Sequence, residues 1–167
     1  MKTRIVTGLV GGLLVLGVGA SPALAETGTT ATQQAAFHNQ QTVVTVDSGA
    51  ATALEFFNIK LDALRPAFGT ATTNYTFPAC TRNGVTELSG GLKFAANDKT
   101  VKVTSIVINT NTKAVKASLN GRRTDVFSLD GQNLVLTAAG ATALNTGLGF
   151  DGLFAEGFLF GGFTTNK

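Results

Sequence analysis

The chain has 167 residues, a length that suits a single domain, and 44% of them are hydrophobic whereas only 14% are charged. This balance excludes an intrinsically disordered chain, which needs few apolar and many charged residues. A single cysteine excludes an internal disulfide and a cysteine-based zinc site, and 12 phenylalanines without any tryptophan indicate a phenylalanine-rich core.

The N-terminal segment has the features of an export signal. Lys2 and Arg4 form a basic end, residues 8–19 are apolar, and Ala23-Leu24-Ala25 fits the small-x-small pattern that signal peptidase recognises. The alternative is a retained membrane anchor, but the apolar run is shorter than the roughly 20 residues that span the hydrocarbon. We therefore expect residues 1–25 to be removed and the protein to be secreted, extracellular or associated with the cell wall.

Removal of the signal changes the charge of the chain. It takes Lys2 and Arg4 from the 13 basic residues and no acidic residue, which leaves 11 basic against 10 acidic side chains. No stripe of basic residues is left for nucleic acid, and no second apolar run reaches the length of a membrane span. The mature chain is thus expected to bind no nucleic acid and to have no transmembrane segment.

The mature chain begins with a polar stretch. Residues 26–41 are rich in threonine and glutamine and predict a flexible leader, followed by a single domain over residues 42–167. The β-branched run Thr42-Val-Val-Thr-Val46 predicts its first strand. Asp47 or Ser48 then caps a short helical turn over residues 49–54.

Two alternating segments follow this turn. Residues 59–64 alternate between apolar and polar side chains and predict a half-buried strand, which ends at Pro66 because proline donates no ladder hydrogen bond. Residues 74–77 alternate in the same way and stop at Pro78, which places Cys80 in a loop.

Residues 84–129 predict an antiparallel meander. Within residues 100–108 the apolar parity switches between Val103 and Ile106, which indicates either a bulge or a strand buried on both faces. Asn120-Gly121 is a preferred pair for a type I′ turn, because both positions need a positive φ. The expected strands cover residues 85–88, 92–94, 100–108, 114–119 and 122–129.

The C-terminal part adds a strand, a helix and a closing strand. Residues 134–136 predict the strand, and residues 138–145 predict a helix that is capped by Thr137 and ends at Gly147 and Gly149. The Phe- and Gly-rich residues 153–163 are expected to supply a closing strand around Phe158 and Phe160. Most elements are therefore strands joined by short turns. The expected fold is all-β, an antiparallel β-sandwich or flattened barrel with two short helices.

Few side chains indicate chemistry, and we expect no catalytic residue and no metal site. His38, the only histidine, lies in the leader, and Cys80 is either a small buried residue or a thiol for an intermolecular disulfide. Arg122-Arg123, the only adjacent basic pair, is interpreted as a solvated hairpin end; the alternative is a contact with a phosphate or a lipid. Tyr75, the only tyrosine, is expected at a core or rim position; the alternative is a haem ligand through its phenolate.

An ordered set of motifs resembles a known family. The set comprises Thr42-Val-Val-Thr-Val46, Phe77-Pro78, Ser89-Gly90-Gly91-Leu92, residues 101–110 and 114–121, and Leu136-Thr-Ala-Ala-Gly-Ala-Thr-Ala-Leu-Asn145 with a closing Phe/Gly segment. Over residues 42–165 the chain resembles the secreted actinobacterial proteins related to the corynebacterial haem-uptake (HtaA-type) domain. The resemblance implies a β-sandwich with short helices.

The same resemblance implies a haem site only in those members that carry its ligands. Haem-binding members use a tyrosine supported by a histidine. Here Glu87-Leu88-Ser89 stands before Gly90-Gly91, where such relatives often carry a histidine, and Tyr75 lies outside the tyrosine motif of the family. No haem ligand is therefore carried over from the family.

The sequence as a whole favours a secreted, non-enzymatic protein of the cell envelope that acts as a structural or binding module without a cofactor. Its partner would be a component of the envelope or a small apolar ligand. The alternative is a haem or small apolar ligand binding or transport protein of the cell surface, with Tyr75 as the candidate haem ligand.

Overall fold

The computed structural model of the chain describes residues 40–71 and 73–166, and the expected signal segment lies outside them. The first strand begins at Gln40, two residues earlier than expected, and the Gln40 side-chain oxygen accepts a hydrogen bond from the Thr81 backbone N–H (2.7 Å). In chain order the elements are β1 (Gln40–Val46), α2 (Ser48–Phe56), β2 (Lys60–Leu64), β3 (Phe68–Ala71), β4 (Asn74–Arg82), β5 (Val85–Leu88), β6 (Gly91–Ala96), β7 (Lys99–Asn109), β8 (Ala114–Leu119), β9 (Arg122–Asp130), β10 (Asn133–Leu136), α3 (Ala138–Leu148) and β11 (Leu159–Asn166).

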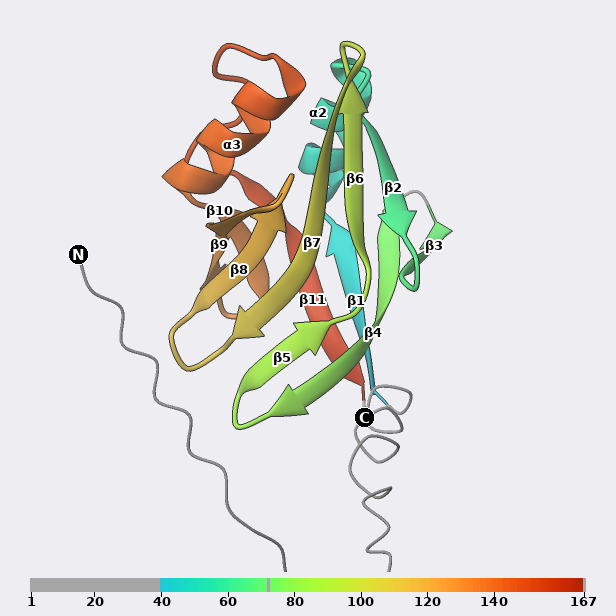
Figure 1. The fold of residues 1–167 in the computed structure, drawn as a ribbon, viewed down its shortest axis with the longest axis vertical. Helices are drawn as coiled ribbons and strands as arrows, with labels where there is room; N and C mark the ends of the chain where they lie inside the picture. Colours follow the sequence, from blue (N-terminus) through green and yellow to red (C-terminus); the bar gives the residue numbers. More distant parts are fainter. Residues whose placement is uncertain (1–39, 72, 167) are drawn as a thin grey trace, which may run out of the picture.

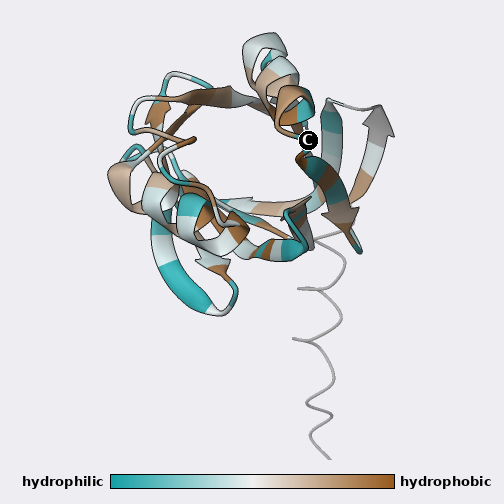
Figure 2. Cartoon of the chain, turned by 90° about the horizontal axis from the view of Figure 1, so that it is seen from above, coloured by the Kyte–Doolittle hydropathy of each residue, from teal (hydrophilic) through white to brown (hydrophobic). Residues whose placement is uncertain are grey.

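The sheet closes into a barrel. Eight antiparallel strands form a ring in the order β7-β5-β4-β1-β11-β10-β9-β8, and β8 pairs back onto β7. Strands β6 and β2 extend the sheet from β7, and β3 pairs with β4. Both helices lie toward one end of the ring, the upper end in Figure 1, and the ring is seen end-on in Figure 2. The expected antiparallel β fold with two short helices is confirmed, in its barrel form.

A β-bulge in β7 explains the parity switch seen in the sequence. Ser105 has a positive φ of 51°, and the register of β7 against β8 shifts between Thr104 and Val107. The extra residue turns the strand over, so Val103 and Ile106 are both buried although their positions differ in parity. The expected bulge is confirmed. Beyond it, the same edge of β7 changes its partner from β6 to β5.

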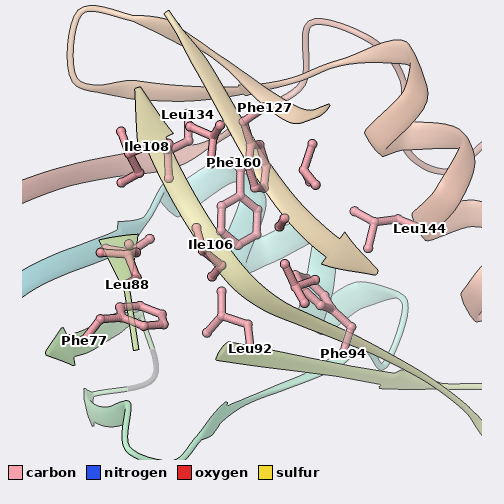
Figure 3. Close-up of a pocket in the computed structure, with 15 residues that line it drawn as sticks. Phe77, Leu88, Leu92, Phe94, Ile106, Ile108, Phe127, Leu134, Leu144 and Phe160 are labelled. Atoms are coloured by element: carbon pink, nitrogen blue, oxygen red, sulfur yellow. The ribbon is translucent and has the colours of Figure 1, made fainter. Parts of the chain in front are cut away.

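Apolar side chains fill the interior of the barrel. Phe77, Phe94, Phe127 and Phe160 point into a common space together with leucine, isoleucine and valine side chains from the surrounding strands (Figure 3). The free volume left between them is about 20 Å³. An eight-stranded barrel is just wide enough for side chains to fill it, and here the side chains form a packed core.

Each helix begins at a capping side chain that the sequence indicated. The Asp47 carboxylate accepts a hydrogen bond from the Gly49 N–H (2.8 Å), and the Thr137 hydroxyl oxygen accepts one from the Gly140 N–H (3.0 Å). These bonds satisfy N–H groups that have no partner within a first helical turn. The two strand-to-helix connections, β1 to α2 and β10 to α3, are therefore stabilised in the same way, by a side chain that caps the first helical turn.

Replacing Thr137 with alanine should lower the free energy of unfolding by about 1 kcal/mol, because the Gly140 N–H loses its acceptor. Urea denaturation of the purified domain measures this loss. Thr137→Ser keeps a hydroxyl at the cap and should retain most of the stability. An alanine variant as stable as the serine variant would contradict the capping role.

Helix α3 runs past the residue that was expected to help end it. Gly147 lies inside the helix, where a Cβ would come within 2.3 Å of Val101 Cγ2, so this glycine allows close packing on β7. Gly149, with φ 76°, is the residue that ends the helix. The helix was expected to stop at residue 145 because both glycines were assigned to its end.

Strand β4 also runs past an expected stop, Pro78. The Pro78 carbonyl accepts a hydrogen bond from the Ser89 N–H (2.8 Å), so the backbone polar groups of this residue face away from β1. On that side of β4, pairing with β3 ends at Thr76 and pairing with β5 begins at Ala79, so no partner strand needs the N–H that proline lacks. Cys80 consequently lies in a strand and is half-buried; its placement in a loop was wrong.

The closing strand starts later than expected. Residues 151–158 form a loop, which is held by the side chain of Asn145. The Asn145 amide donates a hydrogen bond to the Phe154 backbone carbonyl oxygen (2.8 Å) and accepts one from the Phe154 backbone N–H (2.9 Å). Strand β11 therefore covers Leu159–Asn166: it contains Phe160, as expected, but begins just after Phe158. Strand β3 was not expected, because Phe68–Ala71 carries no alternating pattern.

Candidate functional site

Tyr75, the candidate haem ligand, is buried. It lies in β4 opposite Val44 of β1, is 4% exposed, and its phenol donates a hydrogen bond to the Leu61 carbonyl oxygen (2.9 Å). Burial, and to a smaller extent the nearby Asp62 carboxylate, raises the pKa of the phenol. The phenolate that would ligate haem is thus the disfavoured form, and the position is the core one that the sequence favoured.

The pKa of Tyr75 is measurable in isolation because the chain has one tyrosine and no tryptophan. Ultraviolet absorbance titration should give a pKa above the ordinary value of 10.0. At a pH between these two pKa values, the Tyr75 phenol of the folded protein keeps its proton, whereas the phenol of the unfolded chain has released it. The stabilisation from this phenol is therefore complete below about pH 10 and is lost as the pH rises through the folded-state pKa.

Tyr75→Phe removes the phenol but keeps the ring, and should abolish this part of the alkaline loss of stability. A phenol that titrates at or below its ordinary value would contradict the burial seen in the structure. So would a Tyr75→Phe variant whose stability falls with pH as steeply as that of the wild type.

An open groove of about 620 Å³ lies between α3 and the β8–β9 hairpin. Helix α3 sits tightly on the barrel beside it, because Gly140 lies against the Val126 backbone of β9 and Gly147 against the Val101 side chain of β7. The exposed residues of α3 line one wall of the groove, namely Ala138, Ala139, Thr142 and Thr146. This volume falls within the range of small-molecule sites, unlike the barrel interior.

Two arginines form part of the opposite wall. Arg122 and Arg123 follow the Asn120-Gly121 turn and are both exposed, as expected for a hairpin end. Arg123 donates to the Ser105 carbonyl oxygen (3.2 Å). The sequence indicated the arginine pair but not the groove, because the facing wall comes from a helix that begins 15 positions later at Ala138.

Exposed phenylalanines gather at the end of the barrel where the helices lie. Phe56 and Phe57, at the end of α2, are 78% and 40% exposed. Their ring centroids are 5.1 Å apart in an edge-to-face arrangement, and Phe57 contacts Phe150, beyond α3, at 6.0 Å. We call Phe56, Phe57 and Phe150 the aromatic patch. The exposure of Phe56 and Phe57 corrects the expectation that the phenylalanines fill the core. The residue type alone did not indicate which phenylalanines would be exposed.

The histidine, metal ligands and membrane-spanning helices were also considered. His38 lies outside the described residues. Within residues 40–71 and 73–166, no group of three or more His, Cys, Asp or Glu side chains could hold a metal ion. In the same part of the chain, neither helix has the length and apolar character needed to cross a membrane.

Comparison with known proteins identifies a similar fold. A scan against family models and a search of curated proteins by sequence found no match. Among solved structures, the chain is similar to the C-terminal domain of HtaA from Corynebacterium glutamicum, with a TM-score of 0.52 and 13% identity. The similarity covers 76% of this chain and 94% of that domain. The resemblance found in the sequence is therefore supported at the level of the fold.

Proposed function

We propose that the chain is an exported, non-enzymatic module of the cell envelope that acts by binding. The observation that carries this proposal is the packed barrel, whose interior leaves about 20 Å³ while an open groove of about 620 Å³ lies on its outside. Such a molecule is a rigid frame that offers its outer surfaces for recognition. Export is proposed from the basic, apolar and small-residue pattern of residues 1–25.

Export is tested by expressing the whole chain in an actinobacterial host and separating cytoplasm, wall and medium. The protein should be found in the wall fraction or the medium, with Glu26 as its first residue. Replacing Leu13 and Leu14 with arginine interrupts the apolar run and should retain the chain in the cytoplasm. Wild-type protein that stays cytoplasmic with its N-terminus intact would contradict the proposal.

The absence of catalysis is proposed from the sequence, where the single histidine lies in the leader and no nucleophile and base share a motif. Purified mature protein should give no turnover in a screen of ester, glycoside and peptide substrates beyond that of a heat-denatured sample. Turnover that follows the folded protein through purification would replace this proposal with a secreted hydrolase.

A second candidate function is the binding of haem or another small apolar ligand, and the aromatic patch favours it. Exposed, edge-to-face phenylalanine rings offer a surface on which a flat apolar molecule can stack. Titration with haemin, followed by the Soret band, tests this function. A saturable one-to-one band lost in Phe56→Ala/Phe57→Ala but kept in Tyr75→Phe would establish binding at the patch. A band lost in Tyr75→Phe alone would assign the ligand to the phenol.

A further inference from the structure

Five neighbouring strands of the sheet share one outer face. Their backbone pairing, in the order β2-β6-β7-β8-β9, aligns one residue of each strand in a single row, namely Leu64, Gly91, Thr104, Ser118 and Arg123. The row beside it contains Leu92, Val103 and Leu119, which are buried. Because side chains alternate between the two faces of a strand, the first row and the residues two positions from it lie on the outer face.

Four cations gather on this outer face. Lys93 of β6 lies directly opposite Lys102 of β7, and Lys60 of β2 is the diagonal neighbour of Lys93. Arg123 of β9 reaches across β8 and donates to the Ser105 carbonyl oxygen of β7 (3.2 Å), which holds its guanidinium over the same face. We call Lys60, Lys93, Lys102 and Arg123 the cationic face.

The protein does not neutralise this charge. Asp62 pairs with Lys93 (2.9 Å), and Asp125, two positions from Arg123, pairs with Lys116 (3.4 Å). No other ion pair occurs in residues 40–71 and 73–166, so three of the four cations have no carboxylate partner in that part of the chain. Two lysines that lie directly opposite each other also repel. The cationic face therefore concentrates positive charge, although the mature chain expected from the sequence has 11 basic against 10 acidic side chains.

The spacing of the cations favours a polymer over a small anion. From β2 to β9 the face extends over about 19 Å, because adjacent strands lie about 4.8 Å apart. A chain with recurring anionic groups can contact all four cations, whereas a small anion contacts only its nearest neighbours. Thr100, Thr104 and Ser118 add hydroxyl groups that can bond to those of a sugar. Among the described residues of this face none is aromatic, so it lacks the rings on which nucleic-acid bases stack.

We propose that the cationic face binds an acidic polysaccharide, which lies across the five strands with its carboxylates at the four cations and its hydroxyls at the threonine and serine side chains. This inference rests on the proposed binding function and names the partner class of one surface. Each exposed ion pair contributes little by itself, so the affinity comes from several contacts made along one chain.

Oligogalacturonates of two lengths test the proposal, followed by amide chemical shifts of the mature protein. Octagalacturonate should bind saturably, with shifts centred on the five strands, and at least about tenfold more tightly than digalacturonate, which is too short to span the face. The neutral sugar chain maltooctaose should not bind. An ionic strength of about 1 M should remove most of the binding, because salt then screens exposed charges beyond about 3 Å.

Two double variants distinguish the cationic face from charge in general. Lys102→Gln/Arg123→Gln acts on the face, and Arg82→Gln/Lys113→Gln acts on exposed residues at the β4–β5 and β7–β8 turns, at the end of the barrel away from the helices (Figure 1). Each variant removes one lysine and one arginine. The first should weaken the binding of octagalacturonate about tenfold or more, and the second should leave it unchanged.

Asp62→Asn releases Lys93 from its ion pair and should tighten the binding about twofold or more. Weaker binding by this variant, equal loss in the two double variants, or equal affinity for the two oligogalacturonates would each overturn the proposal. Tighter binding of polyphosphate or single-stranded DNA than of octagalacturonate would assign the face to another polyanion and overturn it too. Wild-type protein that does not bind octagalacturonate would overturn this inference alone, because export and the absence of turnover are measured separately.

Discussion

Phe77→Ala is expected to lower the free energy of unfolding by about 3–5 kcal/mol. The Phe77 ring is fully buried and points from β4 into the interior (Figure 3). The strands around it are paired on both edges in a closed ring, so they cannot move inward to fill the space that alanine leaves. The loss is measured by urea denaturation with linear extrapolation.

Phe56→Ala is the matched control for this prediction. It deletes the same atoms from a side chain that is 78% exposed, and should change the stability by no more than about 0.5 kcal/mol. If the two variants lose the same stability, the interior is not packed around Phe77 as described.

Gly140→Ala is expected to destabilise the protein by about 2–3 kcal/mol, although alanine is the better helix former by about 1 kcal/mol. A Cβ at residue 140 would lie 2.3 Å from the Val126 carbonyl oxygen. The oxygen belongs to the backbone and the Cβ position is fixed by the backbone of residue 140, so no side-chain rotation relieves the contact, and α3 must move away from β9. Thermal and urea denaturation should both show the loss.

Gly49→Ala in α2 is the control for helix propensity. The nearest atom to its new Cβ would be the Asp47 carboxylate oxygen, at 3.1 Å, which is the end of a side chain that can shift slightly. We expect a change of less than about 1 kcal/mol. If Gly140→Ala were as mild as Gly49→Ala, the close approach of α3 to β9 would be refuted.

Features with a local cause were predictable from the sequence. The Asn120-Gly121 turn follows from its need for positive φ, the helix starts follow from Asp47 and Thr137, and the bulge at Ser105 follows from the parity of the flanking residues. In each case a few neighbouring residues determine the backbone, so the chain itself carries the signal.

Features that depend on distant partners were not predictable. Strand β4 passes through Pro78 only because β3 and β5 leave a gap on that edge, and Gly147 stays inside α3 only because Val101 packs against it. The groove has the same origin. Its arginine pair was visible in the sequence, but its second wall is brought there by the packing of α3 on the barrel.

The ring places the earliest described strand beside the last one. The Thr42 and Thr165 hydroxyls are hydrogen-bonded at 2.8 Å although 123 positions separate them. A chain still emerging from the ribosome therefore cannot complete its barrel until the C-terminal residues have been synthesised. Closure through such distant pairing is slow compared with local folding. For a chain exported as we propose, this delay keeps the barrel unfolded, and therefore able to pass through a translocation channel, until synthesis is complete.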